Sequence, residues 1–162
     1  MKTGITKEIE CKLANKYLKT ALRFAFEVPI SNGKDFGYVD FITTEIDFKN
    51  FSIPKISCYE IKISVSDFKS VNGHNLYGDF NWYVVTEEVY EWLIKEENMG
   101  HLEYGIIVYK NGKLFIKKNA FENTYKKMPI EYRFRLLDDI LVKWESGTMY
   151  RMLKECEIDL RN

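Results

Sequence analysis

Residues 57–64 read SCYEIKIS, and their alternation predicts a buried β-strand that carries both an acid and a base. Residues two apart on a strand face the same side, so Glu60 and Lys62 project from one face. Tyr59 and Ile61 take the opposite face, where they can pack. Charged side chains are rare within so apolar a strand unless they are paired or functional. A carboxylate and an ammonium held side by side favour a metal site that activates water.

The composition is that of a folded protein with one domain. Apolar residues make up 46% of the 162 residues, with 11 Phe, 11 Tyr and 3 Trp, which is enough for a real core. Lys and Arg total 24, as do Asp and Glu, so binding of nucleic acid by the whole surface is disfavoured, whereas a local basic patch is compatible with this balance. The N-terminus lacks the apolar segment of a signal peptide, and no apolar run approaches the roughly 20 residues that cross a bilayer. We therefore expect no membrane partner.

The cysteines and histidines argue against a zinc site or a disulfide framework. Cys11, Cys58 and Cys156 are scattered along the chain, and an odd set without a close pair predicts reduced thiols. Only two histidines, His74 and His101, are present, which makes zinc ligation unfavoured. These observations lead us to expect a cytoplasmic protein.

The order of the predicted elements is helix, three strands, helix, strand, then helix, hairpin and helix. This order predicts an α/β (or α+β) domain with a mixed sheet. The nearly apolar strand over 81–86 is expected at the centre of the sheet. The expected ranges are a helix over 6–19 capped by Thr6, strands over 21–30, 37–43 and 57–64, a short helix over 67–71 capped by Ser66, a strand over 81–86, a helix over 87–97, strands over 104–109 and 113–118 about an Asn111-Gly112 turn, and a helical region over 130–154 interrupted at Gly147.

A second carboxylate, Asp40, lies in the middle of the strand over 37–43, where an isolated charge would be costly. If this strand pairs with the strand over 57–64, Asp40 and Glu60 can sit side by side on one sheet face. Two carboxylates and a main-chain carbonyl make an all-oxygen site that suits Mg²⁺ or Mn²⁺. Lys62 would then orient a metal-bound water or stabilise charge on phosphorus. The alternative is a structural salt bridge among the three side chains on a half-exposed sheet.

The pattern Asp40…Glu60-Ile61-Lys62 resembles the D…(D/E)-x-K signature of the PD-(D/E)XK nuclease superfamily, which has the restriction-endonuclease-like fold. The resemblance implies that Asp40 and Glu60 ligate the metal and that the main-chain carbonyl of Ile61 completes the site. It also implies that Lys62 serves the attacking water. The proline that precedes the first aspartate of the signature is replaced by Val39 here.

The resemblance covers about half of the chain. The predicted element order over 6–86 is similar to the αβββαβ core of the superfamily, and 87–162 would be a C-terminal elaboration. The segments DFKS at 67–70, GHNLYG at 73–78 and YVV at 83–85 are similar to the MmcB-like branch and its phage relatives.

Further acidic and imidazole side chains are candidates for the same site. Many members of the superfamily carry an acid on the first helix, and Glu8 and Glu10 both match, with solvated helix carboxylates as the alternative. Glu27 lies on the expected active face of the first strand and could substitute. His74 could contact a scissile phosphate or make a hydrogen bond within its loop.

Basic residues after the core could hold nucleic acid. Lys69 could reach the site from its helix, or it could be solvated. Positive charge on and after the hairpin could bind phosphates independently of sequence, and the alternative is a charged edge strand that resists aggregation. The hairpin candidates are Lys110, Lys113, Lys117 and Lys118.

The sequence thus leads us to expect a metal-dependent nuclease that hydrolyses phosphodiester bonds of DNA. The competing class is a module on the same fold that binds nucleic acid or protein without cleaving it. A third class is an accessory protein of a phage or mobile element that forms a homodimer through the helix beyond Gly147.

Overall fold

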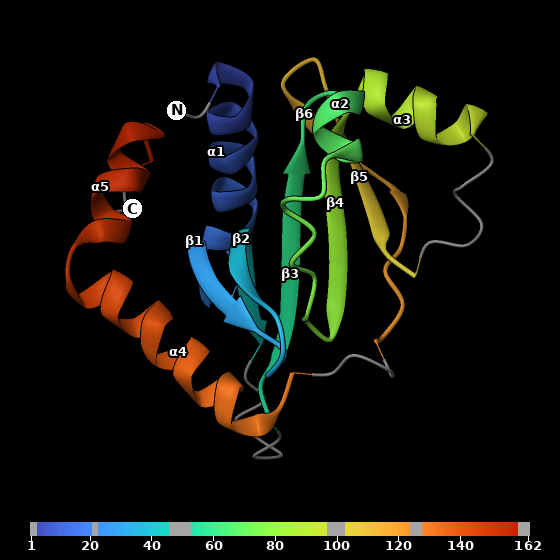
Figure 1. The fold of residues 1–162 in the computed structure, drawn as a ribbon. Helices are drawn as coiled ribbons and strands as arrows, with labels where there is room; N and C mark the ends of the chain where they lie inside the picture. Colours follow the sequence, from blue (N-terminus) through green and yellow to red (C-terminus); the bar gives the residue numbers. More distant parts are fainter. Residues whose placement is uncertain (1–2, 21–22, 46–52, 97–102, 124–127, 159–162) are drawn as a thin grey trace.

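In the part of the chain that the structure describes, one mixed sheet of six strands organises the fold, and its strands follow one another in sequence order from β1 to β6. The computed structural model describes residues 3–20, 23–45, 53–96, 103–123 and 128–158. The strands are β1 Arg23–Ser31, β2 Phe36–Glu45, β3 Lys55–Lys62, β4 Phe80–Thr86, β5 Gly105–Lys110 and β6 Lys113–Lys118. The helices are α1 Gly4–Leu18, α2 Val65–Lys69, α3 Glu87–Lys95, α4 Ile130–Glu145 and α5 Thr148–Glu155 (Figure 1). The expected α/β class with a mixed sheet is confirmed.

The strand directions divide the sheet into two parts. Strands β1, β2 and β3 form an antiparallel meander, whereas β4 and β5 run parallel to β3. Strand β6 returns antiparallel to β5 through Asn111 and Gly112, whose φ values of 49° and 73° suit the tight hairpin that this dipeptide predicts. Strand β4 lies inside the sheet, between β3 and β5, as its apolar sequence predicts.

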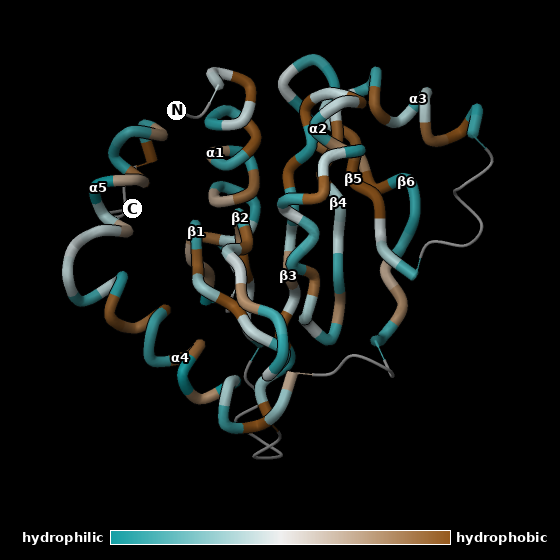
Figure 2. The backbone as a smooth tube through the Cα atoms, viewed as in Figure 1, coloured by the Kyte–Doolittle hydropathy of each residue, from teal (hydrophilic) through white to brown (hydrophobic). Residues whose placement is uncertain are grey.

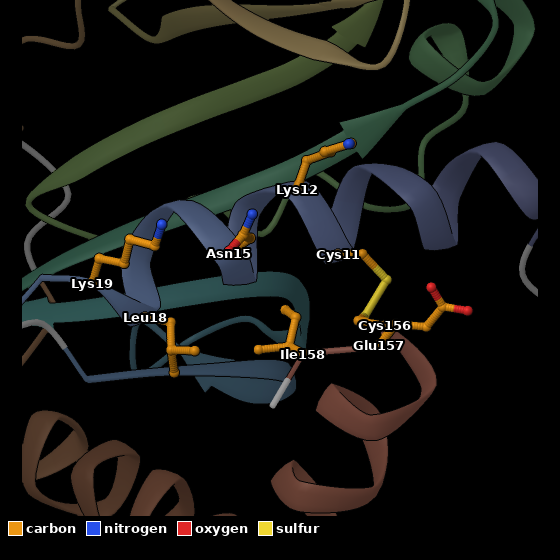
Figure 3. Close-up of a pocket in the computed structure, with 8 residues that line it drawn as sticks. All are labelled: Cys11, Lys12, Asn15, Leu18, Lys19, Cys156, Glu157 and Ile158. Atoms are coloured by element: carbon orange, nitrogen blue, oxygen red, sulfur yellow. A yellow bond between two sulfur atoms is a disulfide. The ribbon is translucent and has the colours of Figure 1, made fainter. Parts of the chain in front are cut away.

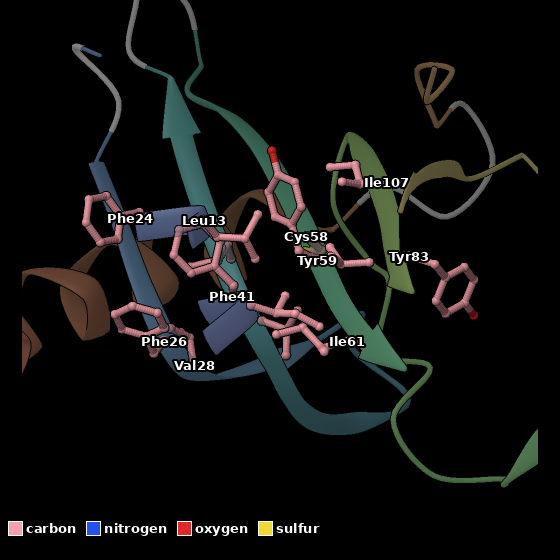
Figure 4. Packing of buried hydrophobic residues seen from close by; sticks show 14 of the residues in the cluster. Leu13, Phe24, Phe26, Val28, Phe41, Cys58, Tyr59, Ile61, Tyr83 and Ile107 are labelled. Atoms are coloured by element: carbon pink, nitrogen blue, oxygen red, sulfur yellow. The ribbon is translucent and has the colours of Figure 1, made fainter. Parts of the chain in front are cut away.

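Helix α1 covers one face of the meander. Tyr17 packs on Phe41 with ring centroids 5.9 Å apart, and its hydroxyl lies 2.7 Å from the hydroxyl of Tyr59. Figure 4 shows Phe24, Phe26 and Phe41 clustered on this face, and all three are essentially inaccessible to solvent. This aromatic core anchors β2 and β3, the two strands that carry Asp40 and Glu60.

The long helix α4 packs beside β1. Its Trp144 indole donates a hydrogen bond of 2.8 Å to the Phe24 carbonyl, and the two rings meet edge to face at 5.6 Å. Hydrophilic and hydrophobic stretches alternate along α4 in Figure 2, as expected for a helix with one face against the protein. Gly147, with a φ of 73°, separates α4 from α5, so the predicted interruption is confirmed.

Helices α2 and α3 lie at the ends to which β3 and β4 point (Figure 1). Phe68 of α2 packs on Tyr83 of β4 with centroids 4.8 Å apart, and Trp92 of α3 packs on Phe68 at 5.8 Å. Tyr83 is the register partner of Glu60, and register partners share a sheet face. Helix α2 therefore covers the face that carries the acid and base of β3.

Two predicted caps are wrong by a few residues. Strand β3 ends at Lys62, and Ser64 instead caps α2 by accepting a hydrogen bond of 3.1 Å from the Asp67 N–H. Helix α1 begins at Gly4, because Thr3 accepts a hydrogen bond of 3.2 Å from the Thr6 N–H. In each case a nearby serine or threonine offers the same chemistry, so the sequence pattern alone does not choose between them.

A disulfide contradicts the expected set of reduced thiols. Cys11 of α1 is bonded to Cys156 at the end of α5, across a sequence separation of 145 residues (Figure 3). The Cα atoms are 5.2 Å apart because α5 returns to the side of α1, a proximity that spacing in the sequence does not reveal. Cys58 is a buried free thiol. The prediction of reduced cysteines is therefore wrong for two of the three.

No helix within the described ranges is both long and apolar enough to cross a membrane.

Candidate active site

The pairing of β2 with β3 brings two carboxyl groups together. Phe41 lies opposite Tyr59, and the next position along this antiparallel register sets Asp40 opposite Glu60 on one sheet face. Glu60 is 2% exposed, and its carboxyl group shares a hydrogen bond with the Asp40 carboxyl group. The expected adjacency of the two acids, which depended on these strands pairing, is thus present.

This environment changes the acidity of Glu60. Burial, followed by the negative charge of Asp40, raises the pKa of Glu60 to about 8. The charge of Lys62 and a hydrogen bond from the Asn75 N–H act in the opposite direction. Two carboxyl groups in contact therefore share a proton or require a nearby cation when both are ionised.

Main-chain donors hold both acids in place. Asp40 Oδ2 accepts a hydrogen bond of 2.8 Å from the Ile61 N–H, so a side chain of β2 is bonded to the backbone of β3. Glu60 Oε1 accepts a longer hydrogen bond of 3.3 Å from the Asn75 N–H. The carboxyl positions are therefore fixed by the backbone of β3 and of the segment after α2.

Lys62 lies on the same strand face as Glu60 and is 3% exposed. Its Nζ donates a hydrogen bond of 3.0 Å to the Asn72 carbonyl and lies 3.8 Å from Asp67 Oδ1. The ammonium is thus buried beneath the turn that follows α2, close to the paired carboxyl groups.

Gly73 lies in this turn, directly against the side chains of Lys62 and Glu60. Its φ is 71°, which favours glycine, and a Cβ there would lie 2.7 Å from Lys62 Nζ and 3.4 Å from Glu60 Oε2. In the sequence, Gly73 stands out only as the first residue of the GHNLYG segment at 73–78. Its role against the Lys62 ammonium was missed, as was the role of Asn75, because no local pattern shows what a turn residue will cover.

The candidate acids of α1 and β1 occupy different environments. Glu27 lies opposite Asp40 in the register of β1 and β2, but it is exposed and has a φ of 49°. Glu8 accepts a hydrogen bond from the hydroxyl of Tyr109, on the hairpin formed by β5 and β6. Glu10 is 4% exposed on α1. In the described part of the chain, no three Asp, Glu, His or Cys side chains converge on a metal position.

His74 makes two hydrogen bonds within its surroundings. Its Nδ1 lies 2.5 Å from the Tyr83 hydroxyl, and its Nε2 lies 2.9 Å from the Ser70 carbonyl. Both ring nitrogens are used, which matches the alternative of a loop hydrogen bond. His74 thereby fixes the segment that carries Gly73 and Asn75.

The candidate basic residues of the hairpin lie on the far part of the sheet, whereas Lys69 lies on α2. Lys69 lies over the Trp92 ring at 4.8 Å, and Lys110 pairs with Glu87. Strand β6, which carries Lys113, Lys117 and Lys118, is three strands from β3, or roughly 14 Å at the usual strand spacing. Burial lowers the pKa of Lys118. The lysines of β6 therefore lie away from Asp40 and Glu60.

A metal at this site would be held by Asp40 and Glu60, with the remaining positions filled by main-chain oxygen, water or substrate. Magnesium commonly binds proteins through one or two carboxylates and keeps several waters or phosphate oxygens. The pair of acids therefore satisfies the usual minimum for Mg²⁺ or Mn²⁺.

The sequence matches no protein-family model and no curated protein. Among solved structures, the chain is similar to the SPO1766 protein of unknown function from Silicibacter pomeroyi. The TM-score is 0.59, and the sequences are 15% identical over 100% of both chains. Such a similarity indicates a shared fold that includes the elements after β4.

Proposed function

We propose that the chain is a metal-dependent nuclease of the PD-(D/E)XK superfamily that hydrolyses phosphodiester bonds of DNA. The observation that carries this proposal is the contact between the half-buried carboxyl group of Asp40 and the buried carboxyl group of Glu60, beside the Lys62 ammonium. The order α1, β1, β2, β3, α2, β4 supports it, since this is the order of the superfamily core.

The acid pair fits a divalent cation on electrostatic grounds. Two carboxyl groups in contact disfavour the charged state of each other, as the raised pKa of the buried Glu60 reflects. A Mg²⁺ or Mn²⁺ ion bound by Asp40, Glu60 and the Ile61 carbonyl would supply charge neutralisation of a phosphate oxygen and a water of lowered pKa.

The chain's own residues contribute orientation and charge. The Ile61 N–H holds Asp40, and the Asn75 N–H holds Glu60, so neither carboxylate has to reorganise when substrate arrives. Lys62 supplies a fixed ammonium that would orient the attacking water or stabilise negative charge on phosphorus. Its hydrogen bond to the Asn72 carbonyl keeps the side chain on this face.

A purely structural salt bridge accounts less well for the arrangement. The hydrogen-bonded contact joins two acids, whereas Lys62 directs its hydrogen bond to a main-chain carbonyl and lies 3.8 Å from Asp67. A close pair of acids, one of them buried, costs stability, and such a cost is common where a fold retains a functional site.

Calorimetry with Mn²⁺ tests the metal site directly. We expect binding by the parent chain and loss of at least tenfold in affinity for Asp40→Asn and for Glu60→Gln. Glu45→Gln is the matched control, because Glu45 is an exposed acid on the same strand as Asp40. A folded parent chain that binds no Mn²⁺ at millimolar concentration, with or without nucleic acid, would overturn the proposal in favour of a binding module.

Cleavage of a panel of DNA and RNA substrates then tests the activity. The panel contains single strands, duplexes, flaps and junctions, each with Mg²⁺, with Mn²⁺ and with EDTA. We expect metal-dependent cleavage of DNA that falls at least 100-fold in Asp40→Asn, Glu60→Gln and Lys62→Met and is unchanged in Glu45→Gln. Metal binding without cleavage of any substrate would contradict the enzyme.

A further inference from the structure

Two exposed aromatic side chains lie on the same strand as Asp40. Phe36 and Tyr38 of β2 are 68% and 60% exposed, and their rings meet edge to face with centroids 5.6 Å apart. Side chains at alternate positions of a strand share a face, so Phe36, Tyr38 and Asp40 form one row. Tyr38 is two residues, or about 7 Å along the strand, from the acid. We call Phe36 and Tyr38 the aromatic step.

The aromatic step is tied to the candidate active site by one residue. Asn75 Nδ2 donates a hydrogen bond of 2.9 Å to the Tyr38 carbonyl, while the Asn75 N–H donates to Glu60 Oε1. Gly37, between the two aromatic residues, packs so closely on Asn75 that a Cβ there would overlap its side-chain amide. The position of the aromatic step relative to Glu60 is therefore set by the same segment that positions the acid.

A cavity of about 430 Å³ adjoins the aromatic step, between the β1–β2 hairpin and α4. Phe36 and Tyr38 form part of its lining, and Tyr132, Arg135 and Asp139 line it from α4. The Arg135 guanidinium lies 5.9 Å from the centroid of the Tyr132 ring. The volume is within the range of small-molecule sites, and the lining combines aromatic faces with one cationic and one anionic group.

We propose that the aromatic step and this cavity receive an unpaired nucleobase next to the phosphodiester held at Asp40 and Glu60. The inference rests on the proposed nuclease function and specifies its substrate class as nucleic acid with single-stranded or displaced nucleotides. Unpaired bases stack on aromatic side chains and on the planes of arginine, whereas paired bases inside a duplex do not expose their faces. Arg135 suits the adjacent phosphate, and Asp139 suits the amino groups of a base edge.

Fluorescence anisotropy in EDTA tests the inference without cleavage, using a labelled single strand and the blunt duplex of the same sequence. We expect the parent chain to prefer the single strand. The affinity of the Phe36→Ala/Tyr38→Ala variant for the single strand should be lower than that of the parent by about tenfold or more, and its affinity for the duplex should change little. The control is Phe121→Ala/Tyr150→Ala, which removes one Phe and one Tyr of matching exposure, 67% and 57%. Equal loss on both substrates, or equal loss in the control, would overturn the inference.

A single abasic nucleotide, moved along the strand, locates the base that stacks. We expect the affinity to fall at one position, adjacent to the phosphate that Mg²⁺-dependent cleavage identifies.

The outcomes separate this inference from the nuclease proposal. If the parent chain cuts duplex DNA and the aromatic-step variant cuts it at the same rate, this inference is overturned and the nuclease proposal stands. A parent chain that binds neither Mn²⁺ nor nucleic acid would overturn both. A dimer that dissociates in the aromatic-step variant would identify the step as a contact between copies and overturn the inference.

Discussion

The burial of the Glu60 carboxyl group makes the stability of the folded protein depend on pH. Its pKa rises from 4.5 to about 8 in the folded protein, chiefly through burial and then through Asp40. Between these values the folded state holds a proton that the unfolded state has lost, so the contribution of Glu60 to stability is largest below about pH 4.5 and falls as the pH rises towards 8. The free energy of unfolding, measured with urea in EDTA, should be lower at pH 8.5 than at pH 5.5 by on the order of a few kcal/mol.

The variant Glu60→Gln isolates this effect, because other titrating groups contribute equally to both proteins. We expect the variant to lack the Glu60 part of the pH dependence and to be more stable than the parent at pH 8.5 without metal. Saturating Mn²⁺ should stabilise the parent at that pH and leave the variant unchanged. Identical pH dependence in the two proteins would show that Glu60 is ionised throughout, against the argument from burial.

Gly73 allows backbone strain to be separated from an effect on Lys62. Gly73→Ala places a methyl group against the Lys62 ammonium, the flexible end of a side chain that can shift while the fold persists. Gly147 has nearly the same φ, 73° against 71°, but nothing lies within 4 Å of a Cβ there. Both alanine variants should lose about 1–2 kcal/mol in urea unfolding.

Only Gly73→Ala should impair cleavage, by about tenfold or more, because only this methyl group displaces the Lys62 ammonium. Rates measured at saturating Mg²⁺ on a substrate that the parent cuts provide the test. Equal rates for Gly73→Ala and Gly147→Ala would show that the position of Lys62 is not critical to the reaction.

At the scale of elements, a buried ion pair joins α4 to the turn before β4. Arg133 Nη1 and Nη2 donate to the two oxygens of Asp79 at 2.7 and 2.8 Å, and Asp79 Oδ2 also accepts from the Ile56 N–H. Arg133→Met would leave a buried, unpaired carboxylate, so we expect a loss of about 3–5 kcal/mol in urea unfolding. The exposed pair of Lys7 and Glu155 is the control, and Glu155→Gln should cost far less stability than Arg133→Met.

The partner substitution distinguishes the buried charge from lost packing. Adding Asp79→Asn to Arg133→Met removes the uncompensated charge while an amide oxygen can still accept from the Ile56 N–H. We expect the double variant to recover part of the stability lost by Arg133→Met. A double variant less stable than Arg133→Met would assign the loss to the packing of the arginine stem instead.

The elements that sequence reasoning predicted are those whose signals are local. Alternation over β3, the Asn111-Gly112 turn and Gly147 each act within a few residues, and the structure contains all three features. Adjacency of Asp40 and Glu60 was conditional on strand pairing, and the meander supplies it. Pairing over a long range has no such signal, so the Asp79–Arg133 pair was missed entirely.

At the scale of the whole molecule, the bond between Cys11 and Cys156 closes nearly the full length of the chain. Its sequence separation of 145 residues means that the bond restricts the unfolded chain strongly. We expect Cys11→Ser/Cys156→Ser to lower the free energy of unfolding by about 2–4 kcal/mol. Thermal and urea unfolding of the oxidised parent, the reduced parent and the double variant provide the measurement.

The effect should be concentrated in α5, because the bond ties the end of that helix to α1. The exposed pair of Lys7 and Glu155 also joins the two helices, and a surface pair of this kind contributes little. Hydrogen exchange should therefore increase in α5 of the double variant, while the amides of β3 and β4 keep their protection. Cys58 serves as the internal control, since burial raises its thiol pKa and should keep it unreactive towards alkylation before and after reduction. Uniformly faster exchange across the sheet would show that the disulfide stabilises the strands that carry Asp40 and Glu60 as well as α5.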